Sequence, residues 1–292
     1  MTVEMMIGRG REAIDMIVDP GSFQENRIGE SEFSPELGPG AVVGEAKLAG
    51  RDIVVIANDA EAINERFPVV YFGVIGMEEA YKMAKTVYTV MRQDAEKAAG
   101  EKRPLLLIVD TPGNAPGKIE EIFGMNKATG AYQLALAEAR RCGHAVVAMV
   151  IGRAISGAFL CHGLQADHIL SLSPEFGTMI HVMPLTSISR MTKLDIERLE
   201  QLAENNPVFA AGPDFFYRLG GVDEMVTELE DMPSAINRHI QEIEAAKAAG
   251  VADCTGPMYH AKLGEQRGGR MHRRPVIERM TAEFAAVAEQ YL

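Results

Sequence analysis

Residues 145–164 read AVVAMVIGRAISGAFLCHGL, an apolar run that passes into small residues at Gly157 and Ala158. Because its first half does not alternate between apolar and polar residues, it predicts a strand buried on both faces, as in a parallel sheet covered by helices. The second half predicts a helix. Small residues at such a junction let an oxygen atom approach main-chain N–H groups at the start of the helix, where the helix dipole favours negative charge. The junction therefore predicts an oxyanion hole.

A second stretch has the same form. Residues 105–117 read LLLIVDTPGNAPG, in which a buried strand over 105–109 leads into a segment rich in glycine and proline. Between the two stretches, residues 119–141 have a helical pattern that ends in two arginines, and cations suit the negative end of a helix. The order strand, helix, strand predicts a right-handed crossover in a parallel sheet. Two oxyanion holes of this kind favour a reaction that passes through an enolate.

The rest of the pattern predicts an α/β fold. Apolar residues at three- and four-residue spacing predict a helix over 78–99, which Gly100 closes. Strands are predicted over 44–48, 51–57, 168–172 and 178–182, and helices near 193–204, 234–248 and 274–291. We expect an irregular N-terminal arm over 1–40 and one domain over 41–292, with a C-terminal helical extension from about residue 234.

Composition excludes several classes of protein. The 292 residues include 29 basic and 41 acidic residues, and the net charge of -12 argues against general binding to nucleic acid or to a membrane surface, because phosphate contacts need a basic face. No apolar run approaches the roughly eighteen residues that a membrane span needs. The cysteines, Cys142, Cys161 and Cys254, form no Cys-x-x-Cys pair, so neither a disulfide framework nor a zinc ribbon is indicated. We expect a cytoplasmic protein with no metal site and no nucleic-acid or membrane partner.

Basic residues nevertheless gather in a glycine-rich loop near the C-terminus. They are Lys262, Arg267, Arg270, Arg273 and Arg274, together with His260 and His272. Two interpretations are open, a solvated loop or subunit contact on the one hand, and a site for phosphate groups or an acidic partner on the other.

Several motifs resemble the ordered motifs of acyl-CoA carboxyltransferases, which belong to the crotonase-like superfamily. They are DMIVDPGSF at 15–23, GEAKLAGR at 44–51 with VVIAND at 54–59, DTPG at 110–113 with PG at 116–117, and GRAISGA at 152–158. The resemblance extends over roughly residues 10–230. Within this superfamily the chain most resembles gamma subunits of biotin-independent malonate decarboxylase. The residues that carry this finer resemblance are RAISGAFL at 153–160, GLQA at 163–166 and LGGV at 219–222.

The resemblance implies a ClpP/crotonase fold, a spiral of ββα units, in which this chain forms half of an active site with a homologous beta subunit. It also implies a substrate carried by an acyl carrier protein, on a phosphopantetheine-type arm derived from dephospho-CoA, so that this chain binds no cofactor itself. The two subunits would convert the malonyl thioester to the acetyl thioester and carbon dioxide without biotin or metal. The implied partners are the beta subunit, the carrier protein and the other subunits of the complex.

By the same resemblance, the N–H groups of Gly157 and Ala158 form an oxyanion hole. The implied substrate-binding residues are Thr111, Pro112, Gly113, Gly117, Arg153 and Ser156. The hole in this chain would hold either the thioester oxygen or the malonyl carboxylate, with the beta subunit holding the other group, and the sequence leaves both assignments open.

Some side chains have a second interpretation. Arg153 is either the partner of a carboxylate or phosphate or a structural salt-bridge partner. Ser156 weakly resembles a hydrolase nucleophile, but the usual Gly-x-Ser-x-Gly is absent.

Other residue types that often carry chemistry are interpreted as structural. His162, His168 and His181 lack metal-ligand spacing. Cys161 is interpreted as a small buried apolar residue rather than a reactive thiol.

Two other functions remain open. The first is the carboxyltransferase subunit of a biotin-dependent acyl-CoA carboxylase, with the biotin carried on a separate chain, because no Ala-Met-Lys-Met occurs here. The second is a non-catalytic subunit that only stabilises the beta subunit.

Overall fold

The computed structural model describes residues 5–183, 185–205, 212–251 and 253–291. Its centre is a mixed sheet in the order β1-β4-β5-β6-β7-β8-β10, with β9 added beside β7. The strands are β1 (Gln24–Glu25), β4 (Ala41–Leu48), β5 (Arg51–Asn58), β6 (Leu105–Thr111), β7 (Val146–Ile155), β8 (His168–Leu172), β9 (Met179–His181) and β10 (Glu224–Val226). All pairs from β5 to β10 are parallel, whereas β1 and β4 pair antiparallel with their neighbours.

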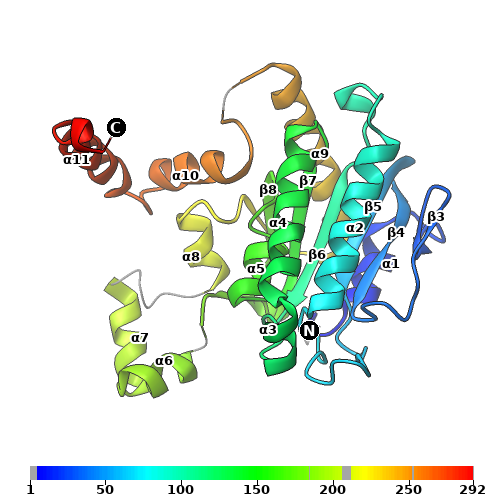
Figure 1. Cartoon of the computed structure of the whole chain (residues 1–292), viewed down its shortest axis with the longest axis horizontal. Helices are drawn as coiled ribbons and strands as arrows, with labels where there is room; N and C mark the ends of the chain where they lie inside the picture. Colours follow the sequence, from blue (N-terminus) through cyan, green and yellow to red (C-terminus); the bar gives the residue numbers. More distant parts are fainter. Residues whose placement is uncertain (1–4, 184, 206–211, 252, 292) are drawn as a thin grey trace.

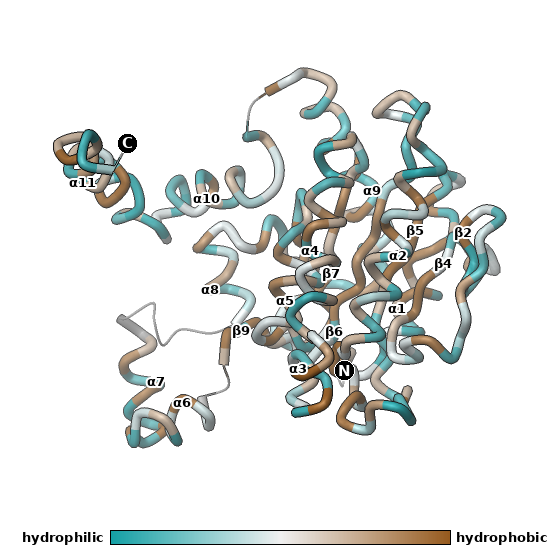
Figure 2. Tube along the Cα trace, in the orientation of Figure 1, coloured by the Kyte–Doolittle hydropathy of each residue, from teal (hydrophilic) through white to brown (hydrophobic). Residues whose placement is uncertain are grey.

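Helices cover both faces of this sheet (Figure 1). α2 (Met77–Gln93) and α4 (Met125–Arg141) pack against one face, and α1 (Gly10–Ile17) and α9 (Met232–Ala248) pack against the other. The central strands are correspondingly apolar along their length, as the brown segments of Figure 2 show.

Both faces of strand β6 are buried, and this explains why apolar and polar residues do not alternate along it. Leu105 and Leu107 belong to the core under α2 and α4, whereas Leu106 and Ile108 belong to the core under α1 and α9. Burying one such side chain stabilises the fold by about 1.5–3 kcal/mol. The predicted strand over 105–109, buried on both faces, is therefore confirmed.

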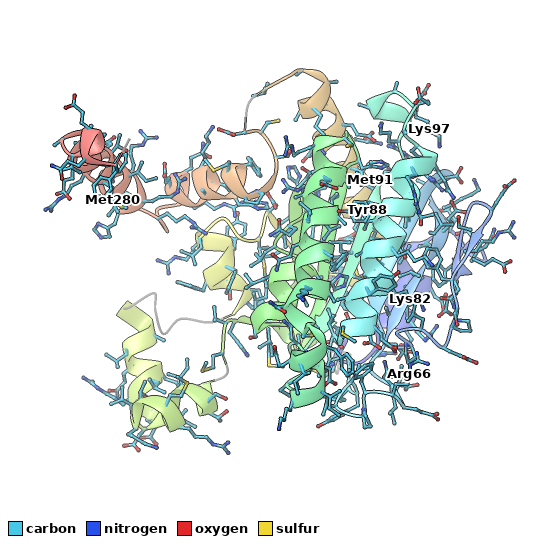
Figure 3. The ribbon with its side chains drawn as sticks, in the orientation of Figure 1. Arg66, Lys82, Tyr88, Met91, Lys97 and Met280 are labelled. Carbon is cyan, nitrogen blue, oxygen red and sulfur yellow. The ribbon has the colours of Figure 1, made fainter. Side chains whose placement is uncertain are left out.

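The two helices of the first face also pack against each other. Tyr88 and Met91 lie on the side of α2 that faces α4 (Figure 3), and both pack against the core. The strands predicted over 44–48 and 51–57 are β4 and β5, which form an antiparallel hairpin that leads through a loop into α2. This hairpin and helix form a ββα unit.

Two predicted helices were too long. The helix predicted over 78–99 ends at Gln93, because the carboxylate of Asp94 accepts hydrogen bonds from the backbone and side chain of Arg103. The helix predicted over 119–141 is two helices, α3 (Lys118–Phe123) and α4, separated by Gly124 at φ +107°.

Several short helices, strands and 3-10 turns were not predicted, most of them in the first forty residues and after residue 184. The arm predicted over 1–40 contains α1, β1, β2 (Arg27–Ile28) and β3 (Ser31–Glu32), and Ile14 and Ile17 of α1 are buried. The helix predicted near 193–204 is confirmed as α7 (Ile196–Asn205), whereas α6 (Leu185–Thr192) before it was not predicted. The further elements are α8 (Pro213–Arg218), α10 (Gly256–Gln266), and the 3-10 turns η1 (Ala99–Glu101), η2 (Pro174–Phe176), η4 (Leu229–Asp231) and η5 (Ala288–Gln290).

The C-terminal part divides into a packed helix and an exposed one. α9, which begins near residue 234 where we predicted an extension, is a layer of the domain, with Ile236, Ile240 and Ile243 buried against the sheet. α11 (Arg273–Ala285) has no buried residue and lies away from the sheet, with Met280 on its surface (Figure 3). Among the described residues, no helix is long and apolar enough to span a membrane.

Candidate functional site

The two stretches that predicted oxyanion holes meet at the carboxyl ends of β6 and β7. The strands are neighbours, and Thr111 at the end of β6 pairs with Ala154 near the end of β7. An added Cβ at Gly157 would lie 2.8 Å from Nδ2 of Asn114, and one at Gly113 would lie 3.9 Å from Cβ of Ser156. The sequence therefore identified segments that lie side by side in space.

The turn between β7 and α5 (Ser156–Cys161) presents bare amides. Ser156 has φ +58° and an exposed side chain, Gly157 is half-buried, and Ala158 is buried. The first N–H groups of a helix have no acceptor within the helix, and no side chain in the described part of the chain caps this end. Because α5 has only six residues, its dipole is small, and the aimed N–H groups themselves must supply the stabilisation.

The second stretch does not repeat this arrangement. The N–H of Gly113 donates to Oγ1 of Thr111 at 3.3 Å, and the N–H of Ala115 donates to the carbonyl of Ile75 at 3.0 Å. Internal hydrogen bonds therefore use the amides of Gly113 and Ala115, which are not free donors for the second oxyanion hole that we expected in this stretch. Gly113, at φ +142°, and the half-exposed Pro112 instead shape the chain beside Ser156.

Gly117 has a local structural role. It precedes α3, and an added Cβ would lie 1.8 Å from a carboxylate oxygen of Glu120. A larger residue would require the side chain of Glu120 to move, and the described contacts do not connect Gly117 with Gly157 or Ala158.

Arg153 forms a structural salt bridge, which was the second of the two roles predicted for it. Nε and Nη2 donate to the two carboxylate oxygens of Asp110, each at 2.9 Å, and the N–H of Arg153 donates to the same carboxylate at 2.7 Å. The N–H of Gly8 supplies a further donor, also at 2.7 Å. The guanidinium lies over the ring of Phe72, with 4.1 Å from Cζ to the ring centroid, and the side chain is only 4% exposed. This pair ties the ends of β6 and β7 together directly beneath the turn.

Three buried polar atoms at or next to this turn have no hydrogen-bond partner among the described residues. They are Oδ1 of Asn114, Nη1 of Arg153 and Nε2 of His181. His181 pairs in β9 with Ile155, the residue before Ser156, and burial lowers its pKa, which keeps the ring neutral near pH 7. Buried polar atoms are normally satisfied, so unpaired ones mark a place where a ligand or water binds.

Asn114 and His181 were not among the predicted site residues. Asn114 lies inside the stretch over 105–117, and this position could have identified it as a candidate site residue. The pairing of His181 with Ile155 depends on where β9 joins the sheet, and local sequence carries no signal for it.

The structural interpretation of His162 and Cys161 is confirmed. His162 is hydrogen bonded to Tyr132 Oη and to the carbonyl of Ile108, each at 2.9 Å, and burial lowers its pKa to about 4. Burial raises the pKa of the Cys161 thiol to about 12, so the thiol is protonated at pH 7 and unreactive.

The basic residues near the C-terminus do not form one glycine-rich loop, because His260 and Lys262 lie on α10. Arg267 donates to the carbonyls of Tyr217, Val222 and Asp223, and Arg270 donates to that of Leu219. Two further arginines pair with Glu265. Arg267 and Arg270 therefore fasten the end of α10 to the segment around the start of β10, a role that differs from both predicted interpretations.

Comparisons with known proteins point to one family. The profile of the family described as "Malonate decarboxylase gamma subunit" matches residues 72–284. The malonyl-S-ACP:biotin-protein carboxyltransferase MADD of Malonomonas rubra is 66% identical over 291 residues, which cover 99% of this chain and 100% of that protein.

Solved structures show the same fold. A Pseudomonas malonate decarboxylase hetero-tetramer in complex with coenzyme A has a chain that is 28% identical, with a TM-score of 0.71 over 94% of this chain and 99% of the other. The Pseudomonas MdcD-MdcE hetero-dimer gives 29% identity and a TM-score of 0.64 over 85% of this chain and 96% of the other. The predicted crotonase-like fold is therefore confirmed.

Proposed function

Because the chain belongs to the malonate decarboxylase gamma-subunit family, we propose that it acts with a homologous beta subunit to convert malonyl-S-ACP to acetyl-S-ACP and carbon dioxide. The observation that carries this proposal is the turn after β7, where the N–H groups of Gly157 and Ala158 lack acceptors within α5 beside buried polar atoms without partners.

The reaction needs an anion-binding site more than it needs an acid or a base. When the bond between the malonyl C2 and its carboxylate carbon breaks, carbon dioxide leaves and the electron pair passes into the thioester, which becomes an enolate. A proton then adds to C2 and gives the acetyl group. Each N–H aimed at the developing oxyanion lowers the barrier by about 2.7–4 kcal/mol. Gly157 and Ala158 supply these donors to an oxygen of the malonyl group.

The residues around the turn position the thioester. In this proposal Thr111, Pro112 and Gly113 form one wall and Ser156 the opposite one, while Arg153 holds the strand ends in register through Asp110. Gly117 acts indirectly, because it lets α3 begin at Lys118.

The site is open to the surface, as expected for half of a shared active site. Leu160 of α5 is 50% exposed, and Val182, one residue after β9, is 76% exposed. We propose that the beta subunit covers these apolar side chains and excludes water from the enolate. The hetero-dimer and hetero-tetramer of the Pseudomonas enzyme support such pairing.

The substrate arrives on its carrier. In the proposal the acyl carrier protein presents the malonyl group on its phosphopantetheine-type arm, and the chain itself binds no cofactor. The complex works in the cytoplasm, where the free Cys142, Cys161 and Cys254 stay reduced.

A second candidate function differs only in the fate of the carboxyl group. The 66% identity to a malonyl-S-ACP:biotin-protein carboxyltransferase favours transfer to biotin on a separate protein. The same carbon–carbon bond breaks, but the carboxyl carbon forms a bond with a biotin nitrogen in place of leaving as carbon dioxide. The enolate, and therefore the work of Gly157 and Ala158, is unchanged.

One reconstitution tests both candidates. The chain is combined with its beta subunit and with malonyl-S-ACP labelled in the carboxyl carbon, with and without a biotinylated carrier protein. Direct decarboxylation releases the label as carbon dioxide without the biotin protein and is insensitive to avidin. Transfer places the label on biotin, and avidin abolishes it. Formation of no acetyl thioester under either condition contradicts the proposed function.

A further inference from the structure

A cluster of histidine and carboxylate side chains joins α9 to the start of β8. Nδ1 of His168 lies 2.8 Å from Nδ1 of His239, and Oε2 of Glu242 lies 3.7 Å from the same nitrogen of His239. Three ligand-type atoms, one from each residue, lie within 4.8 Å of one another. Both imidazoles are buried, with 6% and 5% of their surface exposed. Sequence spacing gave no hint of this cluster, because 71 residues separate the two histidines.

The protonation of His239 is fixed by a neighbour. Its Nε2 lies 2.9 Å from Oε2 of Glu224, and because a carboxylate only accepts, this nitrogen carries the proton. Nδ1 of His239 then accepts a hydrogen bond from the N–H of Nδ1 of His168 at 2.8 Å, and a metal bound between the rings would replace this proton, which would move to Nε2 of His168. A metal-binding histidine typically has this arrangement, with a carboxylate on one nitrogen and the metal on the other.

The charges around the cluster favour a cation. Glu224 and Glu242 bring two negative charges, and Arg238 brings one positive charge, with hydrogen bonds of 2.7 and 2.8 Å to Glu224 and an ion pair of 3.6 Å to Oε1 of Glu242. Asp223 lies on the far side, bonded to Nε2 of His260 at 3.1 Å.

We propose that His168, His239 and Glu242 bind a divalent transition-metal ion, for which zinc is the best fit. Two imidazoles and one carboxylate form a common ligand set for zinc, and a water molecule would complete the tetrahedron. With zinc–nitrogen bonds of about 2.0 Å, tetrahedral geometry places ligand atoms about 3.3 Å apart, so the two nitrogens need to separate by only about 0.5 Å.

The ion would link secondary structure and would not take part in the reaction. His168 pairs with Val147 at the amino end of β7, whereas Gly157 follows its carboxyl end. At about 3.3 Å per residue, these ends are about 25 Å apart. A metal here fastens α9 to the start of β8, and we expect the melting temperature of the chain to depend on it.

The test uses the full-length chain, stripped with a chelator and titrated with Zn²⁺ or Co²⁺ under reducing conditions. We expect one ion per chain, a rise in melting temperature and a Co²⁺ spectrum typical of nitrogen and oxygen ligands. His239→Gln should abolish binding. Glu242→Ala, at an exposed position where folding is safe, should weaken it by at least about tenfold.

Gln241→Ala is the matched control, because Gln241 is also exposed on α9 but lies outside the cluster. It should bind like the wild-type chain. The proposal is overturned if the wild-type chain binds no ion, if Glu242→Ala binds as tightly as Gln241→Ala, or if the Co²⁺ spectrum shows thiolate ligands, since Cys142 is exposed. These readouts do not involve malonyl-S-ACP, so they are independent of the proposed function.

Discussion

Two buried arginine–aspartate pairs stand at opposite ends of β6, and they differ in what surrounds them. Before the strand, Arg103 donates to Asp94 through Nε and Nη2 at 3.0 and 2.9 Å. At its other end, Arg153 donates to Asp110 through the same two kinds of nitrogen, each at 2.9 Å. Asp94 is 0% exposed and Asp110 is 1% exposed, so desolvation is equally severe at both.

The difference lies in how completely the arginines are satisfied. Arg103 also donates to Glu45 and Gln93, and Lys97, labelled in Figure 3, adds a salt bridge to Asp94. Arg153 retains a buried Nη1 without a hydrogen-bond partner in the described part of the chain, and it lies three residues before Ser156. The first pair closes a loop. The second pair supports a site where some polar atoms remain available to a substrate.

The strongest test of this comparison replaces each aspartate by asparagine. Asp110→Asn leaves the buried Arg153 without its counter-charge, and we expect it to lower the free energy of unfolding by about 3–5 kcal/mol. Asp94→Asn should lower it by less, because Arg103 keeps its salt bridge to Glu45. Urea denaturation of the full-length chain measures this loss. At a temperature where both variants are folded, the complex with Asp94→Asn should keep its turnover, whereas Asp110→Asn should lower it. Equal turnover in the two complexes would mean that both pairs serve only the fold.

A second test acts on the amides that the Arg153–Asp110 pair supports. Gly157→Pro removes one N–H, and we expect turnover to fall by a factor of about 100–1000, corresponding to about 2.7–4 kcal/mol. The measurement is the rate of acetyl thioester formation by the assembled complex.

Gly157→Ala is the control for that substitution. It adds a similar Cβ beside Asn114 but keeps the N–H, so it separates crowding from loss of the donor. We expect it to retain most of the turnover. If Gly157→Pro assembles with the beta subunit and turns over like Gly157→Ala, the chain is a non-catalytic stabilising subunit.

The Arg103–Asp94 pair also predicts how part of the free energy of unfolding changes at acid pH. Burial raises the pKa of Asp94, but the hydrogen bonds from Arg103 outweigh this effect and lower the pKa to about 2, from 3.8 in the unfolded chain. A lowered pKa stabilises the fold above the unfolded value, and the contribution is lost as the pH falls toward 2. The difference in unfolding free energy between wild type and Asp94→Asn should therefore shrink between pH 4 and pH 2. A constant difference would contradict this assignment.

The sequence predicted the strands and the turn beside these arginine–aspartate pairs, because the signals for them lie within short segments. β6 and β7 could be recognised because residues buried on both faces are apolar without alternation, and the turn at Gly157 followed from its small residues. The partners of the arginines could not be read in this way. The pairing of Arg153 with Asp110 spans 43 residues. α10 was missed because it contains Gly256 and Gly264, which disfavour a helix; Gly264 lies against the backbone of Leu219, and Gly256 has φ +75°.

The smallest expected effect concerns Ser156, at the exposed tip of the carboxyl-end site. If this serine were a nucleophile, Ser156→Ala would lower turnover by up to about a millionfold, as in a serine hydrolase. We expect a change within about threefold, because the donors to the oxyanion are main-chain groups that Ala retains. The measurement is again acetyl thioester formation by the assembled complex. Because Ser156 has φ +58°, Ser156→Gly should relieve about 1 kcal/mol of backbone strain. If turnover survives Ser156→Ala but not Gly157→Pro, the groups that stabilise the oxyanion are main-chain N–H groups and not the serine hydroxyl.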